Sequence, residues 1–164
     1  MGEVLGRRLV RKMKQIKFFL GTTIILFNEK LDKVLMMKRN GNKKLSPGAW
    51  ANIGGKIEWA EYTLDAAVRE VWEETGFRIR KKDLRFVTYS ERVGHELILI
   101  YTAKIKERSP KMTDEHSHAG WFEIKKLPKP RIKDPVQEAK IVLMEKIPRR
   151  PFQVTWKSQW KEKK

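Results

Sequence analysis

The stretch from 55 to 77, GKIEWAEYTLDAAVREVWEETGF, decides the fold of this 164-residue chain. Its second half predicts a helix from about Leu64 to Thr75, because successive side chains turn by about 100° and the apolar ones then share one stripe. Thr63 or Asp65 is expected to cap the start of this helix, and Gly76 its end. One side of the helix is therefore expected to pack against a core.

The adjoining face of the same helix carries the carboxylates of Glu70, Glu73 and Glu74. Two readings are open. In the first, the face is a solvated acidic surface, and Arg69 reaches Glu73 four residues away. In the second, the three carboxylates are oxygen ligands for Mg²⁺ or Mn²⁺. The glycine pair at 54–55 favours the second reading, because backbone without side chains lets a ligand approach closely.

The same stretch carries a family motif: Gly, five residues, Glu, seven residues, then Arg-Glu-aliphatic-any-Glu-Glu-any-Gly-hydrophobic, nine specified positions matched without a gap. Fixed spacing over so many positions is a strong signal. In this motif the chain resembles the Nudix hydrolases. The resemblance implies an α/β fold, a Nudix-type α/β/α sandwich with a mixed β-sheet between helices. It also implies cleavage of a nucleoside diphosphate linked to another moiety, with Mg²⁺ or Mn²⁺ and a water nucleophile.

The resemblance assigns roles within and beyond the motif. Arg69 would orient the glutamates, Glu61 would steady the junction of loop and helix, and Lys56 would lie near the phosphates. A loop in the position of residues 111–120 often supplies a further acidic group in this family, and here that group is Glu115, with Asp114 second. The expected metal ligands are Gly55 (through its carbonyl), Glu70, Glu73, Glu74 and Glu115. The expected catalytic set is Glu70, Glu73, Arg69, Glu115 and Lys56.

The rest of the chain predicts the remaining layers of a sandwich. Residues 18–27 and 33–38 read as a hairpin, 84–92 and 96–105 as a second hairpin, and 121–124 as a further strand. A second helix is expected from Asp134 as N-cap, with Pro135 at the first helical position, to about Ile147. This helix should cover the sheet face opposite the first helix.

Composition and charge bound the function. A length of 164 residues suits one domain, zero cysteines exclude disulfides and thiolate chemistry, and no apolar run approaches the length of a membrane span. We therefore expect a cytoplasmic protein without a membrane partner, monomeric or homodimeric. Of the net charge of +17, segments 1–17 and 148–164 each carry +5. We expect a basic N-terminal arm (1–17), a Nudix hydrolase domain (18–147) and a basic aromatic tail (148–164). Such a field attracts nucleotides and RNA alike.

The substrate is the least determined part of the prediction. Lys38 and Arg39 begin a basic loop near the expected metal face and are candidate phosphate contacts. The run 48–56 resembles the MutT-type members of the family, which hydrolyse nucleoside triphosphates, and Trp50 and Asn52 are candidate contacts to the base. Asn52 lies one place later than in the human-type members.

Our order of substrates is a nucleoside triphosphate or related small nucleotide, then a dinucleoside polyphosphate, then an RNA 5′ end, with ADP-ribose a further alternative. A hypothesis of a different class is a non-catalytic module that binds nucleotide or RNA. Because such a module would not need every carboxylate of the motif, the complete acidic set favours the enzyme.

Overall fold

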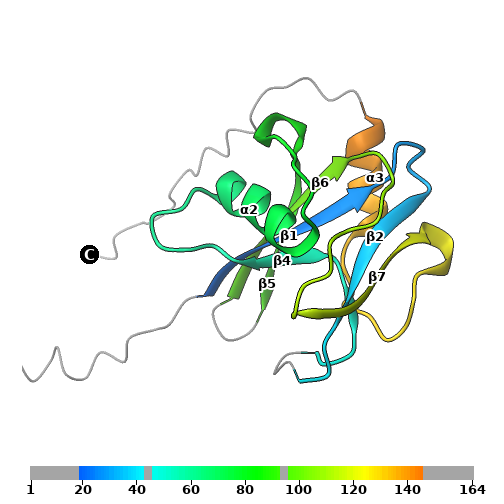
Figure 1. The fold of residues 1–164 in the computed structure, drawn as a ribbon. Coiled ribbons are helices and arrows are strands. Elements are labelled where there is room, and N and C mark those ends of the chain that lie inside the picture. Colours follow the sequence, from blue (N-terminus) through cyan, green and yellow to red (C-terminus); the bar gives the residue numbers. More distant parts are fainter. Residues whose placement is uncertain (1–18, 43–45, 93–95, 146–164) are drawn as a thin grey trace, which may run out of the picture.

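A computed structural model describes residues 19–42, 46–92 and 96–145 of the chain. The predicted basic arm (1–17) and basic aromatic tail (148–164) lie outside these residues. The described part forms a sheet with one helix on each face (Figure 1). In chain order the strands are β1 (Phe19–Phe27), β2 (Lys33–Arg39), β3 (Trp50–Ala51), β4 (Ile53–Lys56), β5 (Arg85–Arg92), β6 (Glu96–Lys104) and β7 (His116–Glu123).

The sheet is mixed, as the sequence predicts. Its order is β3-β2-β1-β6-β5, with β4 beside β1 and β7 beside β2. β1 pairs with β6 in parallel, and the other strand pairs are antiparallel. Ile24 to Phe27 on β1 are all 0% exposed. An apolar run without alternation is typical of a strand covered on both faces.

The helices α2 (Thr63–Thr75) and α3 (Val136–Met144) supply these covers. Ala67 and Val71 of α2 pack with Ile24 and Leu26 on one face of the sheet. Val136 and Ala139 of α3 belong to the core on the other face. The predicted α/β/α layering is confirmed, and the helix that carries the glutamates is fixed to the sheet by its apolar stripe.

Both helix starts differ from the prediction. The N-cap of α2 is Tyr62, not Thr63 or Asp65, and it makes no side-chain capping bond. The N-cap of α3 is Pro135, one residue later than predicted, and the side chain of Asp134 accepts a hydrogen bond from Asn52 instead. The end of α2 is as predicted: Gly76 has φ 71° and donates its N–H to the carbonyl of Trp72.

Two strand predictions also need correction. β1 and β2 are consecutive but pair only at Phe27 and Val34, because β4 occupies the rest of that edge of β1. The strand expected at 121–124 is β7, which begins at His116 and pairs with β2 as far as Arg39. The longer β7 brings the predicted acidic loop to the edge of the site. Two short 3₁₀ turns, η1 (Lys81–Asp83) and η2 (Ile124–Lys126), complete the described elements.

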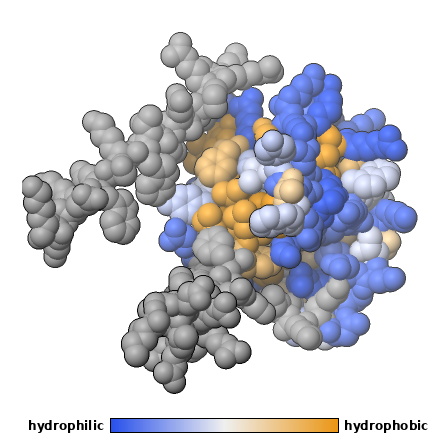
Figure 2. Space-filling model, turned by 90° about the vertical axis from the view of Figure 1, so that its left-hand side faces the viewer, coloured by the Kyte–Doolittle hydropathy of each residue, from blue (hydrophilic) through white to orange (hydrophobic). Residues whose placement is uncertain are grey.

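The surface beside α2 is partly apolar. Figure 2, which faces the left-hand side of Figure 1, shows apolar side chains gathered within a mostly hydrophilic surface. On β5, Phe86 and Tyr89 are about half exposed, because α2 packs on β1 and β4 rather than on this end of the sheet.

Neither helix of the described residues combines the length and the apolar composition that a membrane-spanning helix needs.

Candidate active site

The glycine pair of β4, Gly54 and Gly55, lies against β1 and against the glutamate face of α2. A Cβ on Gly54 would collide with the carbonyl oxygen of Thr22, so only glycine fits between these strands. The freed space lets the N–H of Gly54 donate to Oε1 of Glu74 over 3.1 Å. The turn therefore fixes one oxygen of the last glutamate on the helix.

Gly55 makes room for a second carboxylate. A Cβ at this position would lie 2.5 Å from Oε1 and 2.7 Å from Oε2 of Glu70, well inside van der Waals contact. The carboxylate of Glu70 thus occupies the space that any other residue at position 55 would fill. The glycine of the motif is a steric requirement of the glutamate, as well as a source of a bare carbonyl.

Glu74 is the most unusual ionisable group of the site. It is 7% exposed, and burial is the main reason why its pKa is raised from 4.5 to about 8. The charges of Glu70 and Glu115 act in the same direction, and the Gly54 N–H opposes them. Its Oε2 is buried without a hydrogen-bond partner among the described residues. The 3.5 Å separation from Nε2 of His116 suits an ion pair only when the imidazole is protonated.

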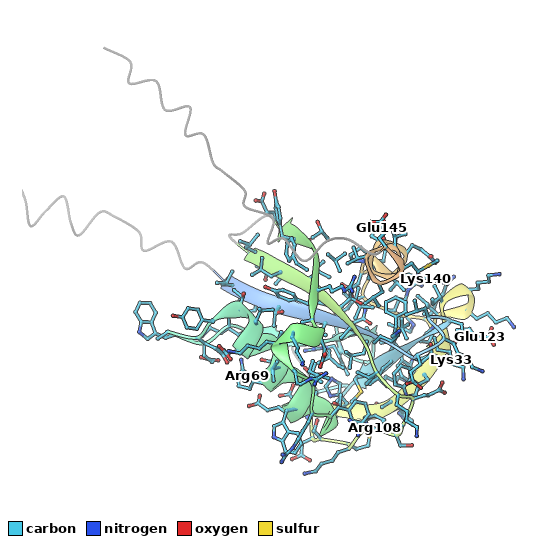
Figure 3. All side chains as sticks on the ribbon, turned by 90° about the horizontal axis from the view of Figure 1, so that it is seen from above. Lys33, Arg69, Arg108, Glu123, Lys140 and Glu145 are labelled. Atoms are coloured by element: carbon cyan, nitrogen blue, oxygen red, sulfur yellow. The ribbon has the colours of Figure 1, made fainter. Side chains whose placement is uncertain are left out.

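Arg69 links the helix to the loop before it (Figure 3). Its Nη1 donates to Glu70 at 2.7 Å and to Glu73 at 2.9 Å. Its Nε and Nη2 donate to the two oxygens of Glu61, and Nη2 also to the carbonyl of Lys56. These bonds lower the pKa of Glu61 and raise that of Arg69. One guanidinium therefore orients both the loop and two glutamates.

This geometry makes Arg69→Lys a damaging exchange despite the retained charge. A single ammonium cannot reproduce a planar fork that serves four acceptor groups. We expect unfolding in urea to show a loss of about 1–3 kcal/mol, because Glu61 and Glu70 are largely buried and lose charged hydrogen bonds. Arg80→Lys is the matched control, since Arg80 pairs only with Asp83 at the surface among described residues. Equal stability of the two variants would contradict the linking role.

The glutamate face opens into a pocket of about 370 Å³. Carboxylates from two separate segments meet there, because the segment before β7 runs past the C-terminal end of α2, where the N–H of Lys111 donates to the carbonyl of Thr75. Glu115, expected from the family resemblance, lies at this pocket, and Thr113 joins it. The pocket is lined by Gly54, Gly55, Lys56, Glu70, Glu73, Glu74, Thr113 and Glu115.

The donor set suits a hard divalent cation such as Mg²⁺. Carboxylate oxygens are the ligands that Mg²⁺ and Mn²⁺ prefer, and the buried Oε2 of Glu74 lacks a hydrogen-bond partner. As they stand, no three of the described His, Asp and Glu side chains converge closely enough to enclose an ion. The hydrogen bonds of Arg69 account for this, since they hold Glu70 and Glu73 toward the guanidinium.

The structure places the other predicted residues in two groups. Lys56 lines the pocket, and the charge of Arg39 acts on Glu74. Lys38 lies on β2 beside β7, where its carbonyl accepts a bond from Ser117. Trp50 packs edge-on against Phe122, and Asn52 donates to Asp134, both on the α3 side of the sheet and outside the pocket lining. Contact of substrate with Lys38, Arg39, Trp50 or Asn52 remains a prediction.

His116 is a neighbour of Glu74 that sequence reasoning missed. It is buried at the first position of β7, directly after Glu115. Two histidines separated by one residue suggest metal ligation only weakly. Nothing in the sequence indicates that this imidazole faces the helix, because that depends on the register of β7 against β2.

The raised pKa of Glu74 predicts a pH-dependent stability. Between its ordinary pKa of 4.5 and about 8, the folded state binds more protons than the unfolded state, so stability falls as pH rises through this window. In EDTA we expect a loss on the order of 3–5 kcal/mol from pH about 5 to about 8. Mg²⁺ should reverse much of it at high pH by favouring the ionised carboxylate. Urea unfolding at stepped pH, with Na⁺ at equal ionic strength as control, measures this, and a flat profile would contradict it.

Carboxylates on one helix, opposed by a glycine turn and an acidic loop, form a pocket whose oxygen donors suit a divalent cation. The model of the NUDIX domain matches residues 17–144. The chain belongs to this family. Consistent with that, it is a hydrolase acting on phosphoanhydride bonds.

Named relatives and solved structures agree with the family. ADP-ribose pyrophosphatase of Methanocaldococcus jannaschii is 28% identical over 135 residues, which are 78% of this chain and 79% of that protein. The m7GpppN-mRNA hydrolase NUDT17 of Bos taurus is 34% identical over 68 residues, 42% of this chain but 22% of that protein. A MutT/nudix family protein of Enterococcus faecalis has a TM-score of 0.60 at 26% identity, covering 75% of this chain and 51% of its own.

Proposed function

We propose that the protein is a Mg²⁺-dependent pyrophosphohydrolase that cleaves a small nucleoside diphosphate-linked molecule. The observation that carries the proposal is the pocket in which Glu70, Glu73, Glu74 and Glu115 face the glycine turn. Four carboxylates around one hollow would repel each other and any phosphate. Divalent cations resolve both conflicts, which is why the acidic pocket supports a metal-dependent enzyme rather than a plain anion-binding module.

The residues of the chain divide the chemistry between them. Glu70, Glu73, Glu74 and the carbonyl of Gly55 would hold the ion, with Glu115 as a further ligand or base. Bound Mg²⁺ would neutralise phosphate oxygens and lower the pKa of a coordinated water. Lys56 and Arg39 supply positive charge beside the pocket for the diphosphate.

A general base must accept the proton of the attacking water. Burial raises the pKa of Glu70, which makes this carboxylate more basic than an ordinary glutamate at neutral pH. Glu115 is exposed at the pocket and can exchange protons with solvent. We propose Glu115 as the base, with Glu70 as the alternative. Because the charge of Glu70 helps to raise the pKa of Glu74, a pH–rate profile would not report Glu70 alone.

The first substrate to test is ADP-ribose, because the Methanocaldococcus jannaschii relative that matches over 78% of this chain is named for it. A nucleoside triphosphate is the next, on the resemblance of residues 48–56 to MutT-type members. An RNA 5′ end is a second candidate function. It is supported by the shorter match to an m7GpppN-mRNA hydrolase and by the net charge of +17.

A product-resolved substrate panel tests the proposal. ADP-ribose, nucleoside triphosphates, dinucleoside polyphosphates and capped RNA would be incubated with Mg²⁺ or EDTA in ¹⁸O-labelled water. We expect Mg²⁺-dependent cleavage of a phosphoanhydride, with label in one product locating the attacked phosphorus. No turnover of any compound, together with tight RNA binding, would instead support the non-catalytic module.

A further inference from the structure

The loop from 57 to 62, between β4 and α2, departs from local sequence preferences at three positions. Ala60 has φ 61°, a left-handed conformation that usually favours glycine or asparagine. Tyr62 occupies the N-cap of α2 without a side-chain capping bond, where Ser, Thr, Asp or Asn is preferred. Trp59 is 98% exposed. Such departures, when they cluster, indicate a function rather than a need of the fold.

Trp59 and Tyr62 are the two most exposed large apolar side chains of the described protein, at 98% and 81%. Neither ring makes a hydrogen bond, ring contact or cation–π contact with a residue that the structure describes. The other tryptophans of the described chain differ. Trp50 packs on Phe122, Trp72 lies under Arg78, and Trp121 donates to the carbonyl of Arg108. The aromatic faces in this loop are therefore available for a ligand.

The backbone of the loop is held in place by hydrogen bonds although the loop projects from the body of the protein (Figure 1). Ile57 is buried and its N–H donates to the carbonyl of Leu20. The N–H of Glu58 donates to the side chain of Glu61, and the N–H of Glu61 to the carbonyl of Glu58. Arg69 binds Glu61 from the helix side. A loop backbone fixed in this way loses little conformational entropy when its side chains bind a ligand.

The loop is also tied to the pocket. Lys56 lines the pocket and is three residues from Trp59, so their Cα atoms lie within about 10 Å of each other. The guanidinium that binds Glu61 also binds Glu70 and Glu73. The loop that carries the two rings therefore begins at the pocket and is bound by the same arginine as two of its glutamates.

We propose that Trp59 and Tyr62 form a stacking platform for the nucleobase of the substrate whose diphosphate lies in the carboxylate pocket. The proposal rests on the function proposed above and adds the residues that select for an aromatic base. Indole and phenol rings stack on any base through their π-faces, without a fixed pattern of hydrogen bonds. The platform therefore predicts a preference for base-bearing substrates with weak discrimination among bases.

A nucleobase suits this platform better than a protein partner. The neighbours of the rings on the loop are charged, with Lys56, Glu58 and Glu61 in sequence, whereas the core of a protein interface is depleted in charge. Two isolated rings offer flat faces to a planar ligand. They do not form the continuous apolar core of an interface.

Calorimetric titration of ADP and of pyrophosphate, each in Mg²⁺, tests the platform, with ADP carrying a base and pyrophosphate lacking one. We expect Trp59→Ala and Tyr62→Ala each to weaken ADP binding, the former by about tenfold, and to leave pyrophosphate binding unchanged. Trp59→Phe should stay close to the parent because it keeps a ring. Tyr89→Ala, which removes an exposed ring on β5, is the control and should change neither titration. On the hydrolysed substrate, Trp59→Ala should raise KM and leave kcat unchanged.

The outcomes separate the two proposals. Parent-like ADP affinity in a Trp59→Ala, Tyr62→Ala double variant would overturn the platform while pyrophosphate binding upheld the pocket. If the parent protein is a dimer in light scattering and the double variant, with parent-like ADP affinity, is a monomer, the rings would be assigned to contacts between copies. That outcome would also overturn the platform. Failure of the parent to bind either ligand would instead overturn the proposed function.

Discussion

Glu74→Gln should lower Mg²⁺-dependent turnover on the order of 10³-fold and should raise the stability of the protein near pH 8. The variant removes an anionic oxygen from the carboxylate pocket but keeps the shape of the side chain and an acceptor for the N–H of Gly54. Burial makes the ionised form of a carboxyl group with a pKa of about 8 energetically unfavourable, and an amide does not ionise. Activity and stability should therefore move in opposite directions.

The protonation of Glu74 on folding determines how much the free energy of unfolding should rise in Glu74→Gln. At pH about 8 the unfolded chain carries an ionised Glu74, whereas folding holds that group half protonated in a buried site. Removal of this linkage should contribute about 2–4 kcal/mol in EDTA. Turnover, urea unfolding and the Mg²⁺ dependence of both would be measured. Glu138→Gln, an exposed exchange on α3, is the control. A variant that keeps parent-like Mg²⁺ dependence would show that Glu74 is no metal ligand.

Gly55→Ala is expected to reduce turnover by at least about 10²-fold. The added methyl group would lie 2.5–2.7 Å from three atoms of the Glu70 carboxyl group, so that carboxylate must move. Its movement also disturbs the 2.7 Å bond to Arg69 and hence the orientation of Glu73. Small displacements of positioned groups lower rates strongly even when the fold persists.

The matched control is Gly41→Ala, because a Cβ at Gly41 meets no atom within 4 Å in the described structure. Circular dichroism and urea unfolding would establish that Gly55→Ala is folded. The difference in turnover between folded Gly55→Ala and Gly41→Ala then measures the effect of the methyl group on the site, separate from any loss of folded protein. Parent-like turnover in folded Gly55→Ala would mean that Glu70 does not need its present position for catalysis.

The sequence predicted the helix of the site well because two independent patterns coincide there. The apolar period places one face of α2 on the sheet, and the glutamates at 70, 73 and 74 then face the pocket. Gly76 fixed the end of the helix, since a left-handed C-cap strongly favours glycine. Its start was predicted less well. Ser, Thr, Asp and Asn preferences are weak when tertiary contacts hold the preceding loop, as the bonds of Glu61 do here.

Long-range pairing set the remaining differences. The insertion of β4 beside β1 separates β2 from most of its consecutive partner, and no local turn signal encodes that choice. The start of β7 at His116 likewise follows from its register with β2. For the same reason the burial of His116 near Glu74 was not predictable. The polarity of 111–120 indicated a loop, but residues 116–120 belong to β7 and pair with β2.

The pairing of Arg69 with Glu70 and Glu73 makes uptake of a divalent ion an internal exchange of counter-ions. An arriving cation would compete for Glu70 and Glu73 with a guanidinium that is already bound to both and to Glu61. The strength of the Arg69 ion pairs would therefore influence how readily the pocket takes up an ion. Substitutions that strengthen or weaken these ion pairs would therefore change the ion concentration at which the enzyme operates. They would do so without altering any atom that touches the ion.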